Sequence, residues 1–428
     1  MITTGRGSTP PGRTRSIVAA VIGNFVEFYD WTIYAFMAPI FAQQMFPSAS
    51  KFAALLLAFS IFALGYVARP LGAFMFGAYG DRVGRRASMT AAIVIMAACS
   101  LLIGLTPTHA AIGNFAPALI VVARCLQGLA AGGEAGSAQT YLAELAASGR
   151  RAATASMQQI STGLSTLFAL GVSTLLAASL TPTELSSWGW RVPFVLGALI
   201  GTVGIYLRLT AAETLEPAAD PAHVTSFSTV LKRHTRAVVR TTAICLLPSV
   251  AFFSWQIYLP TYIAETTALS RQTSLGIVTL STVVFVVLIV PFAFLSDRWG
   301  RRPMMLLFAA SALVWAYPTF IGLPTFMGSF TGAVTVAVVG NIIMALMGSS
   351  ISAVLTEAFP TSIRATGVGL AQAISVVISG ATFPPVVTAL LAAQRYDLIF
   401  LFVATFAVIS LIATFMMPET RARDLRHI

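Results

Sequence analysis

Two carboxylates stand inside an apolar run near the start of the chain, in the segment GNFVEFYDWTIYAF at residues 23–36. Glu27 and Asp30 are three positions apart, so on a helix both side chains face one side. Burial favours the neutral form of a carboxyl group, while a nearby arginine favours the ionised form. A carboxyl group held between these two influences can take up and release a proton. The pair therefore predicts proton binding by Asp30, with Glu27 as the partner that holds an arginine.

Three more ionisable side chains, Arg69, Arg124 and Glu134, lie inside apolar segments. A charge left unpaired at the centre of a membrane helix costs about 2.5–3.5 kcal/mol, so these groups must face one another or a cavity. The guanidinium forks of Arg69 and Arg124 suit a carboxylate ligand. Three acids against two arginines leave one negative charge, which a proton would neutralise, and Glu134 is the second candidate proton carrier. The alternative is a static network of buried ion pairs that only holds helices together.

Helical periodicity places further polar side chains beside these charges. At 100° per residue, Asn24, Trp31 and Tyr34 share one stripe with Glu27 and Asp30, and Gln127 shares another with Arg124 and Glu134. In the second half of the chain the polar candidates are uncharged. The residues predicted to contact substrate are Arg69, Arg124, Asn24, Tyr34, Gln127, Trp255, Gln256 and Tyr258. For the aromatic members, core packing or anchoring at the lipid interface is the competing interpretation.

The composition indicates what carries these residues. Hydrophobic residues make up 57% of the 428 and charged residues 10%, too few charges to cover a soluble protein of this length. Apolar windows of membrane-spanning length recur along the chain and predict an all-α membrane protein with twelve transmembrane helices. The predicted parts are a cytoplasmic tail at 1–16, a six-helix half at 17–210, a cytoplasmic linker at 211–238, a second six-helix half at 239–418 and a cytoplasmic tail at 419–428.

The basic residues are distributed unevenly between the two faces of this predicted bundle. Most of the 26 Lys and Arg residues fall on one set of loops and on both tails, and only Lys51, Arg191, Arg271 and Arg395 fall on the opposite loops. This asymmetry follows the positive-inside rule and predicts that both termini are cytoplasmic. The net charge of +11 therefore orients the helices, and no nucleic-acid partner is needed to explain it.

Two loop motifs are repeated between the halves. GAYGDRVGRR at 77–86 matches AFLSDRWGRR at 293–302, and YLAELAASGRRA at 141–152 matches VLTEAFPTSIRA at 354–365. The repeats predict two pseudo-symmetric halves and a latch of acids, arginines and helix ends on the cytoplasmic side. We expect the second copy to be looser, because Ala293 stands where the first copy has glycine. The predicted latch residues are Gly77, Asp81, Arg82, Gly84, Arg85, Arg86, Glu144, Arg151, Asp297, Arg298, Gly300, Arg301, Arg302, Glu357 and Arg364.

These motifs resemble the loop signature of the major facilitator superfamily. The stretches GNFVEFYDW, GYVARPLGAFMFGAYGDRVGRR, RCLQGLAAGGEAGSAQTYLAELA and WGWRVPF further resemble its metabolite:proton symporter family. The resemblance implies proton-coupled symport of a small organic carboxylate, a di- or tricarboxylate such as alpha-ketoglutarate or citrate, by alternating access in a bacterial inner membrane. A zwitterionic or hydroxylated solute of the proline/betaine or shikimate type is the alternative. The short tail after residue 418 makes the proline/betaine branch less expected.

Other classes of protein find little support in the sequence. It has no Cys/His cluster at metal-ligand spacing, no phosphate-binding loop and no nucleophile elbow, so we expect neither an enzyme nor a metal or cofactor, only the proton as coupling ion. A passive channel would need a continuous polar pore, whereas the charges gather in one half. A receptor would normally have a large domain outside the membrane. The expected partners are a small organic anion, protons and the lipid bilayer, and we expect a monomer.

Overall fold

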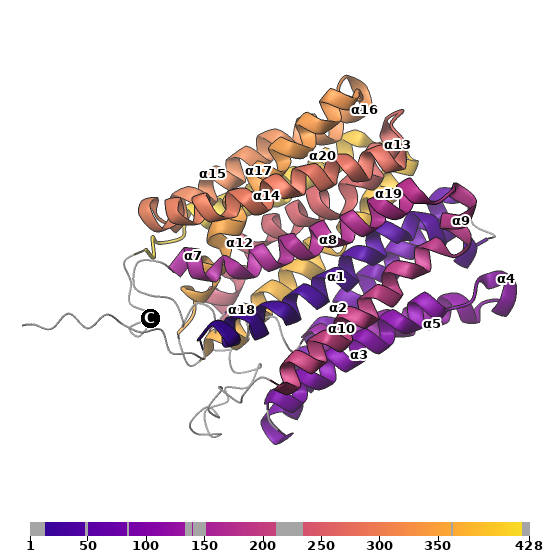
Figure 1. Cartoon of the computed structure of the whole chain (residues 1–428). Coiled ribbons are helices and arrows are strands. Elements are labelled where there is room, and N and C mark those ends of the chain that lie inside the picture. The colour runs from indigo at the N-terminus through magenta and orange to yellow at the C-terminus, as the bar shows by residue number, and fades with distance from the viewer. Residues whose placement is uncertain are drawn as a thin grey trace, which may run out of the picture.

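The computed structural model describes residues 13–47, 50–83, 85–132, 139, 151–210, 234–360 and 363–421, and every regular element in these ranges is helical (Figure 1). The long helices of the first half lie close to the predicted apolar windows, and short helices connect them. These elements are α1 (Arg13–Met45), α2 (Lys51–Val83), α3 (Arg85–Leu105), α4 (His109–Ile112), α5 (Phe115–Gly132), α7 (Arg151–Ala155), α8 (Met157–Ser179), α9 (Pro182–Ser187), η1 (Gly189–Arg191) and α10 (Val192–Thr210).

The second half repeats this arrangement, but three of its spans contain a short π-helical segment. Its elements are α12 (Thr235–Phe252), η3 (Phe253–Tyr258), α13 (Leu259–Thr266), α14 (Arg271–Trp299), α15 (Arg301–Tyr317), η4 (Pro318–Gly322), α16 (Leu323–Thr325), α17 (Phe330–Thr356), α18 (Arg364–Ser375), η6 (Val376–Gly380), α19 (Phe383–Ala392) and α20 (Tyr396–Phe415).

The helices confirm an all-α membrane architecture. Within the described residues, eleven continuous helical stretches are long and apolar enough to cross a membrane, and α1, with 33 residues and two internal acids, is the twelfth span. Residues 211–233 of the predicted linker lie outside the described part of the chain, and α12 begins at Thr235.

Glycines allow the close approach of α2 and α5, the two helices that carry the buried arginines. A Cβ atom at Gly128 would overlap the carbonyl oxygen of Gly65, and one at Gly132 would overlap the carbonyl oxygen of Arg69. Backbone contact of this kind is typical of small-residue ridges in membrane helices. Arg69 and Arg124 are therefore held on adjacent helices that are in direct backbone contact. Although Pro70 follows Arg69, α2 continues through it without a break.

The two halves meet along α2 and α8 of the first half. α8 packs against α14, and α2 packs against α18 and α19. In Figure 1, α7 lies at the left end of the bundle, whereas α9, α13 and α16 lie at the right. We call the left end, where Asp297 contacts α7, the Asp297 end, and the right end, where Lys51 contacts Glu265, the Lys51 end. Contacts between the halves at both ends decide whether the interior is open.

Candidate substrate and proton site

Glu27 on α1 and Arg69 on α2 form an ion pair in the interior of the first half. Arg69 Nη2 lies 2.6 Å from Glu27 Oε1, and only 3% of the Glu27 side chain is exposed. The Arg69 guanidinium also lies 4.4 Å from the ring centre of Tyr66 and 4.7 Å from that of Trp31. The expectation that Glu27 holds an arginine is confirmed, and its charge and that of Arg69 neutralise each other.

Arg124 on α5 is fully buried and has a different environment. Its Nη1 donates to Gln127 Oε1 at 2.9 Å and its Nη2 donates to the backbone carbonyl of Asp30 at 3.3 Å. The guanidinium lies 3.8 Å from the ring centre of Tyr34. Among the described residues, no carboxylate oxygen lies within 4 Å of this guanidinium. A cation–π contact contributes only about 0.5–2 kcal/mol, so Arg124 is a buried cation that the described residues leave without a counterion.

Three hydrogen-bond donors around Trp31 lack partners in the described part of the chain. They are Arg69 Nε, Arg124 Nε and Trp31 Nε1. Trp31 links the two arginines, because both guanidinium groups lie within 5.1 Å of the centre of its ring. Buried donors are rarely left unsatisfied, and several of them around one cation favour an anionic ligand. Trp31 belonged to the predicted polar stripe of α1 but was not among the predicted substrate contacts.

Asp30 lies next to this arginine without forming an ion pair with it. Ser100 on α3 donates a hydrogen bond to Asp30 Oδ1 at 2.6 Å, and Asp30 Oδ2 is buried without a partner among the described residues. A Cβ atom at Gly197 on α10 would lie 2.7 Å from Oδ1, so glycine is needed there for α10 to approach. Within the described ranges, the other titratable or charged groups facing Asp30 are Tyr29, Cys99 and Arg124. One carboxylate oxygen is thus fixed and the other is available to carry a proton.

The remaining predicted contacts of the first half are engaged with neighbouring helices. Asn24 Nδ2 donates to Thr162 Oγ1 at 3.0 Å and to the backbone carbonyl of Gln158 on α8 at 3.3 Å. Gln158 Nε2 donates to Asn24 Oδ1 at 3.3 Å. The Tyr34 hydroxyl donates to the carbonyl of Ala58, so its ring face, not its hydroxyl, meets Arg124. Gln127 orients Arg124. Within the described residues, Asn24 is therefore placed to join α1 to α8, and Tyr34 and Gln127 to position the arginine.

In the second half, Trp255, Gln256 and Tyr258 all lie on the π-helical segment η3 and are fully buried. Trp255 Nε1 donates to Thr319 Oγ1 at 3.2 Å, and the Tyr258 hydroxyl lies 2.7 Å from Thr388 Oγ1. Gln256 Nε2 donates to Asn341 Oδ1 at 2.9 Å. π-helical segments are rare and often occur at functional sites. No sequence pattern indicated this local change in helix geometry.

Both ends of the interior are closed by contacts between the halves. At the Lys51 end, Lys51 Nζ lies 2.7 Å from Glu265 Oε2, and Arg271 donates to the carbonyl of Phe36. At the Asp297 end, the Asp297 carboxylate accepts the backbone N–H groups of Ala152 and Ala153 at 3.1 and 3.2 Å. Arg124, Asp30 and Glu27 are at most 3% exposed. The structure is therefore an occluded conformation.

The second motif copy forms a latch at the Asp297 end. The expectation that this copy is looser than the first stays a prediction, because the side chains of the first copy lie outside the described part of the chain. Arg301 Nη1 lies 3.0 Å from Asp297 Oδ1, and Arg301 Nη2 lies 3.4 Å from Glu357 Oε1. Ala293 is buried without disturbing these contacts. Arg364 Nε donates to the carbonyl of Phe359, Arg302 Nη2 to that of Phe415, and Arg298 is exposed. Glu134, Gly84 and Glu144, and the side chains at positions 77, 81, 82, 85, 86 and 151, lie outside the described part.

Glu419 completes this latch and was not predicted. Its carboxylate accepts the backbone N–H groups of Arg301 and Arg302 at the start of α15, both at 3.0 Å. Burial opposes ionisation of Glu419, but backbone N–H groups of Arg301, Arg421, Arg302 and Thr420 hold its pKa below the ordinary value. Gly300, with φ of 112°, leaves the space that Glu419 fills. Thr420 also donates to Glu357, so the residues after the last span bind the repeated motif.

Asp297→Asn is expected to weaken closure of the Asp297 end. The variant keeps the size of the side chain but loses the negative charge that interacts with two N–H groups of α7 and with Arg301. Asparagine keeps one neutral acceptor, and a charge-assisted hydrogen bond contributes about 1–2 kcal/mol more than a neutral one, so we expect a roughly five- to thirtyfold shift toward the form open at this end. The measurement is the labelling rate of a cysteine placed at Ala153 in a chain lacking Cys99, Cys125 and Cys245. Arg298→Gln, which removes an exposed charge from the same end of α14, is the control. Equal labelling of both variants would contradict the latch.

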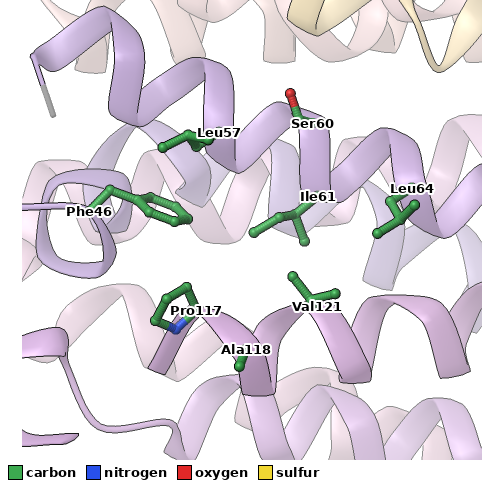
Figure 2. A pocket seen from close by; sticks show the side chains of 8 residues that line it. All are labelled: Phe46, Leu57, Ser60, Ile61, Leu64, Pro117, Ala118 and Val121. Carbon is green, nitrogen blue, oxygen red and sulfur yellow. The ribbon is translucent and has the colours of Figure 1, made fainter. Parts of the chain in front are cut away.

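A shallow groove lies between α2 and α5 near the Lys51 end (Figure 2). It is bordered by Phe46, Leu57, Ser60, Ile61, Leu64, Pro117, Ala118 and Val121. Ser60 Oγ already donates to the carbonyl of Leu56, and the other side chains are apolar. The groove offers no charged group to a carboxylate, so it is not the site that the buried arginines indicate.

Comparison with known proteins agrees with this geometry. The family model described as Major Facilitator Superfamily matches residues 20–324 and 269–427. The alpha-ketoglutarate permease of Escherichia coli (strain K12) is 32% identical over 410 residues, covering 95% of this chain and 94% of that protein. The citrate-proton symporter of Klebsiella pneumoniae is 34% identical over 383 residues, covering 89% and 86%. The proline/betaine transporter of Salmonella typhimurium is 29% identical, covering 96% and 85%.

Solved structures support the same fold. The proton:xylose symporter XylE bound to 6-bromo-6-deoxy-D-glucose superposes with a TM-score of 0.73 at 17% identity, covering 97% of this chain and 98% of that one. At this identity the likeness concerns the fold alone. The family model matches most of the sequence, and two of the named transporters are more than 30% identical to it. The chain therefore belongs to the major facilitator superfamily of membrane transporters, in the group that resembles the metabolite:proton symporters.

Proposed function

We propose that the protein is a proton-coupled symporter of a small organic carboxylate, which it moves by alternating access between its two halves. The observation that carries the proposal is Arg124, a fully buried guanidinium that the described residues leave without a carboxylate partner, beside an acid that forms no ion pair with it. A ligand carboxylate would supply the missing counterion. The alpha-ketoglutarate and citrate relatives support a di- or tricarboxylate, and the proline/betaine relatives keep the zwitterionic alternative open.

In the proposed cycle, the Lys51 end faces the outside and the Asp297 end and both termini face the cytoplasm of a bacterial inner membrane. With the Lys51 end open, the substrate carboxylate binds Arg124 and the donors around Trp31. Proton uptake at Asp30 Oδ2 removes the negative charge beside the bound anion, so the two can be occluded together. The halves then rock about the enclosed site, the contacts of Asp297 with α7 break, and substrate and proton leave on the cytoplasmic side.

A passive channel is less consistent with this structure. A channel conducts through a continuous polar path, whereas here contacts between the halves close both ends and the site is at most 3% exposed at Glu27, Asp30 and Arg124. Closure at both ends is the state through which an alternating-access transporter must pass. The structure thus supports a carrier that encloses its substrate during transport.

The proposal is tested by uptake into proteoliposomes with an inward-directed proton gradient. Radiolabelled alpha-ketoglutarate, citrate, shikimate, proline and betaine would be supplied separately, each with and without a protonophore. We expect at least one carboxylate to accumulate above its outside concentration, and the accumulation to collapse when the protonophore is added. Equilibration without accumulation would indicate a facilitator, and accumulation that survives the protonophore would exclude proton coupling.

A further inference from the structure

The buried charges limit how much negative charge the occluded site can hold. Arg69 and Arg124 are the two arginines that contact Trp31, and Glu27 already neutralises Arg69 at 2.6 Å. Arg271, the first residue of α14, is also buried, but it lies at the Lys51 end, where it interacts with Glu265 and donates to the carbonyl of Phe36. Glu134, which lies outside the described residues, can add only negative charge. With Asp30 protonated, the interior therefore offers one uncompensated positive charge. A second ionised carboxylate on the ligand would be buried without a counterion, which is strongly unfavourable.

The polar side chains around η3 in the second half are uncharged, and their hydrogen bonds fix the orientation of one amide. Asn341 Nδ2 donates to the carbonyl of Ala337 at 3.1 Å and to Ser281 Oγ at 2.9 Å, so the other amide atom of Asn341 is the acceptor. Gln256 must then turn its Nε2 toward Asn341 Oδ1. This leaves Gln256 Oε1 as a fully buried acceptor without a partner in the described structure. Such an acceptor requires a donor, an O–H or N–H group.

Gln256 lies on the element of the second half that packs against the arginine site. Phe253, three residues before it on η3, contacts Phe62 and Tyr66 edge to face, with ring centres 5.9 and 5.4 Å apart. Phe62 lies 5.7 Å from the Arg124 guanidinium, and Tyr66 lies 4.4 Å from that of Arg69. η3 also contacts α1. One layer of aromatic rings therefore separates the element that carries Gln256 from both arginines.

We infer that the ligand is taken up as a monoanion that presents one carboxylate to Arg124 and a hydrogen-bond donor, a hydroxyl or a protonated carboxyl, to Gln256 Oε1. This inference rests on the proposed function and narrows its substrate class. A hydroxycarboxylate meets both requirements directly. A dicarboxylate meets them only in its singly protonated form, because its dianion would bring one buried negative charge in excess.

The first test compares two ligands of equal chain length, 5-hydroxypentanoate and glutarate, together with the corresponding four- and six-carbon pairs. Dissociation constants for the wild-type protein would be measured by calorimetry in detergent between pH 6.5 and 7.5. Both ligands meet the same protein groups, so titration of Asp30, Glu27 or Glu134 cancels in the ratio of the two constants. If only the singly protonated diacid binds, the dissociation constant of the diacid divided by that of the hydroxy acid rises about tenfold per pH unit. A constant ratio would show dianion binding and overturn the inference while leaving the proposed function intact.

The second test isolates the donor. 5-Hydroxypentanoate and its isomer 4-methoxybutanoate have the same atoms and charge, but only the first can donate to Gln256 Oε1. We expect wild type to prefer the hydroxy acid by at least about tenfold, and Gln256→Met to lose the preference. Equal binding of the isomers by wild type, or an unchanged preference in the variant, would contradict the role of Gln256. If no carboxylate of any length binds, the proposed function itself fails, and this inference with it.

Discussion

Arg124→Lys is expected to weaken carboxylate binding by about 100-fold, although it keeps the positive charge. The arginine is fully buried, its guanidinium carbon lies 3.8 Å from the ring centre of Tyr34, and Gln127 orients it through a hydrogen bond of 2.9 Å. Lysine cannot stack in this way, cannot present two parallel donors, and is more strongly hydrated as an ion. Charge-assisted hydrogen bonds contribute about 1.5–3 kcal/mol each, and losing their paired geometry costs about 3 kcal/mol, a factor of about 100.

The matched control is Arg69→Lys, the same substitution on the adjacent helix. Arg69 is already paired with Glu27 at 2.6 Å, and lysine can preserve that ion pair, so we expect a loss of affinity below about tenfold. Binding would be measured by calorimetry on variants that elute as wild type from size exclusion and keep its helical circular dichroism. If Arg124→Lys binds carboxylates as wild type does while Arg69→Lys does not, the two arginines have exchanged roles. Normal binding by both would make them structural.

The spans and the ion pair at Glu27 could be predicted from the sequence because both depend on strong local signals. An apolar window of about 20 residues is much longer than the uncertainty in where it begins and ends, so the span can be located from the sequence. The twelve helices follow these windows closely. An acid and an arginine inside apolar helices have few possible partners, since leaving either charge unpaired in the membrane is costly. The prediction that Glu27 holds an arginine needed no more than this, and Arg69 on α2 satisfies it.

Other features of the site depend on contacts between distant segments that the sequence does not record. Ser100 is one of many small polar residues in apolar helices, and nothing local marks it as the donor to Asp30. In the sequence, Glu419 looks like a solvated residue of the tail. In the structure, the backbone N–H groups at the start of α15 donate to its carboxylate. The contacts of Asp297 are made by Arg301 and by α7, 145 residues earlier in the chain. The π-helical form of η3 likewise depends on its surroundings.

Asp30→Asn is expected to abolish proton-driven accumulation while leaving substrate exchange largely intact. Asparagine is nearly isosteric with the protonated acid and retains an acceptor for Ser100, which donates at 2.6 Å, so the site keeps its shape. It is also neutral at every working pH, so the site can occlude substrate without binding a proton. Accumulation needs each substrate to be coupled to a proton, whereas exchange needs only that the loaded carrier can reorient. We therefore expect the accumulation ratio to fall to about one.

The two activities would be measured on the same proteoliposomes: uptake driven by a pH gradient, and counterflow of labelled substrate at equal pH on both sides. Ser100→Ala is the matched control, because it removes a hydrogen bond from the same carboxyl group without removing its charge, and we expect it to retain coupled accumulation. Loss of counterflow together with uptake in Asp30→Asn would instead give Asp30 a role in binding or folding. If Asp30→Asn still accumulates substrate, the proton is carried by another acid, and the same paired measurement on Glu27→Gln and Glu134→Gln would identify which one.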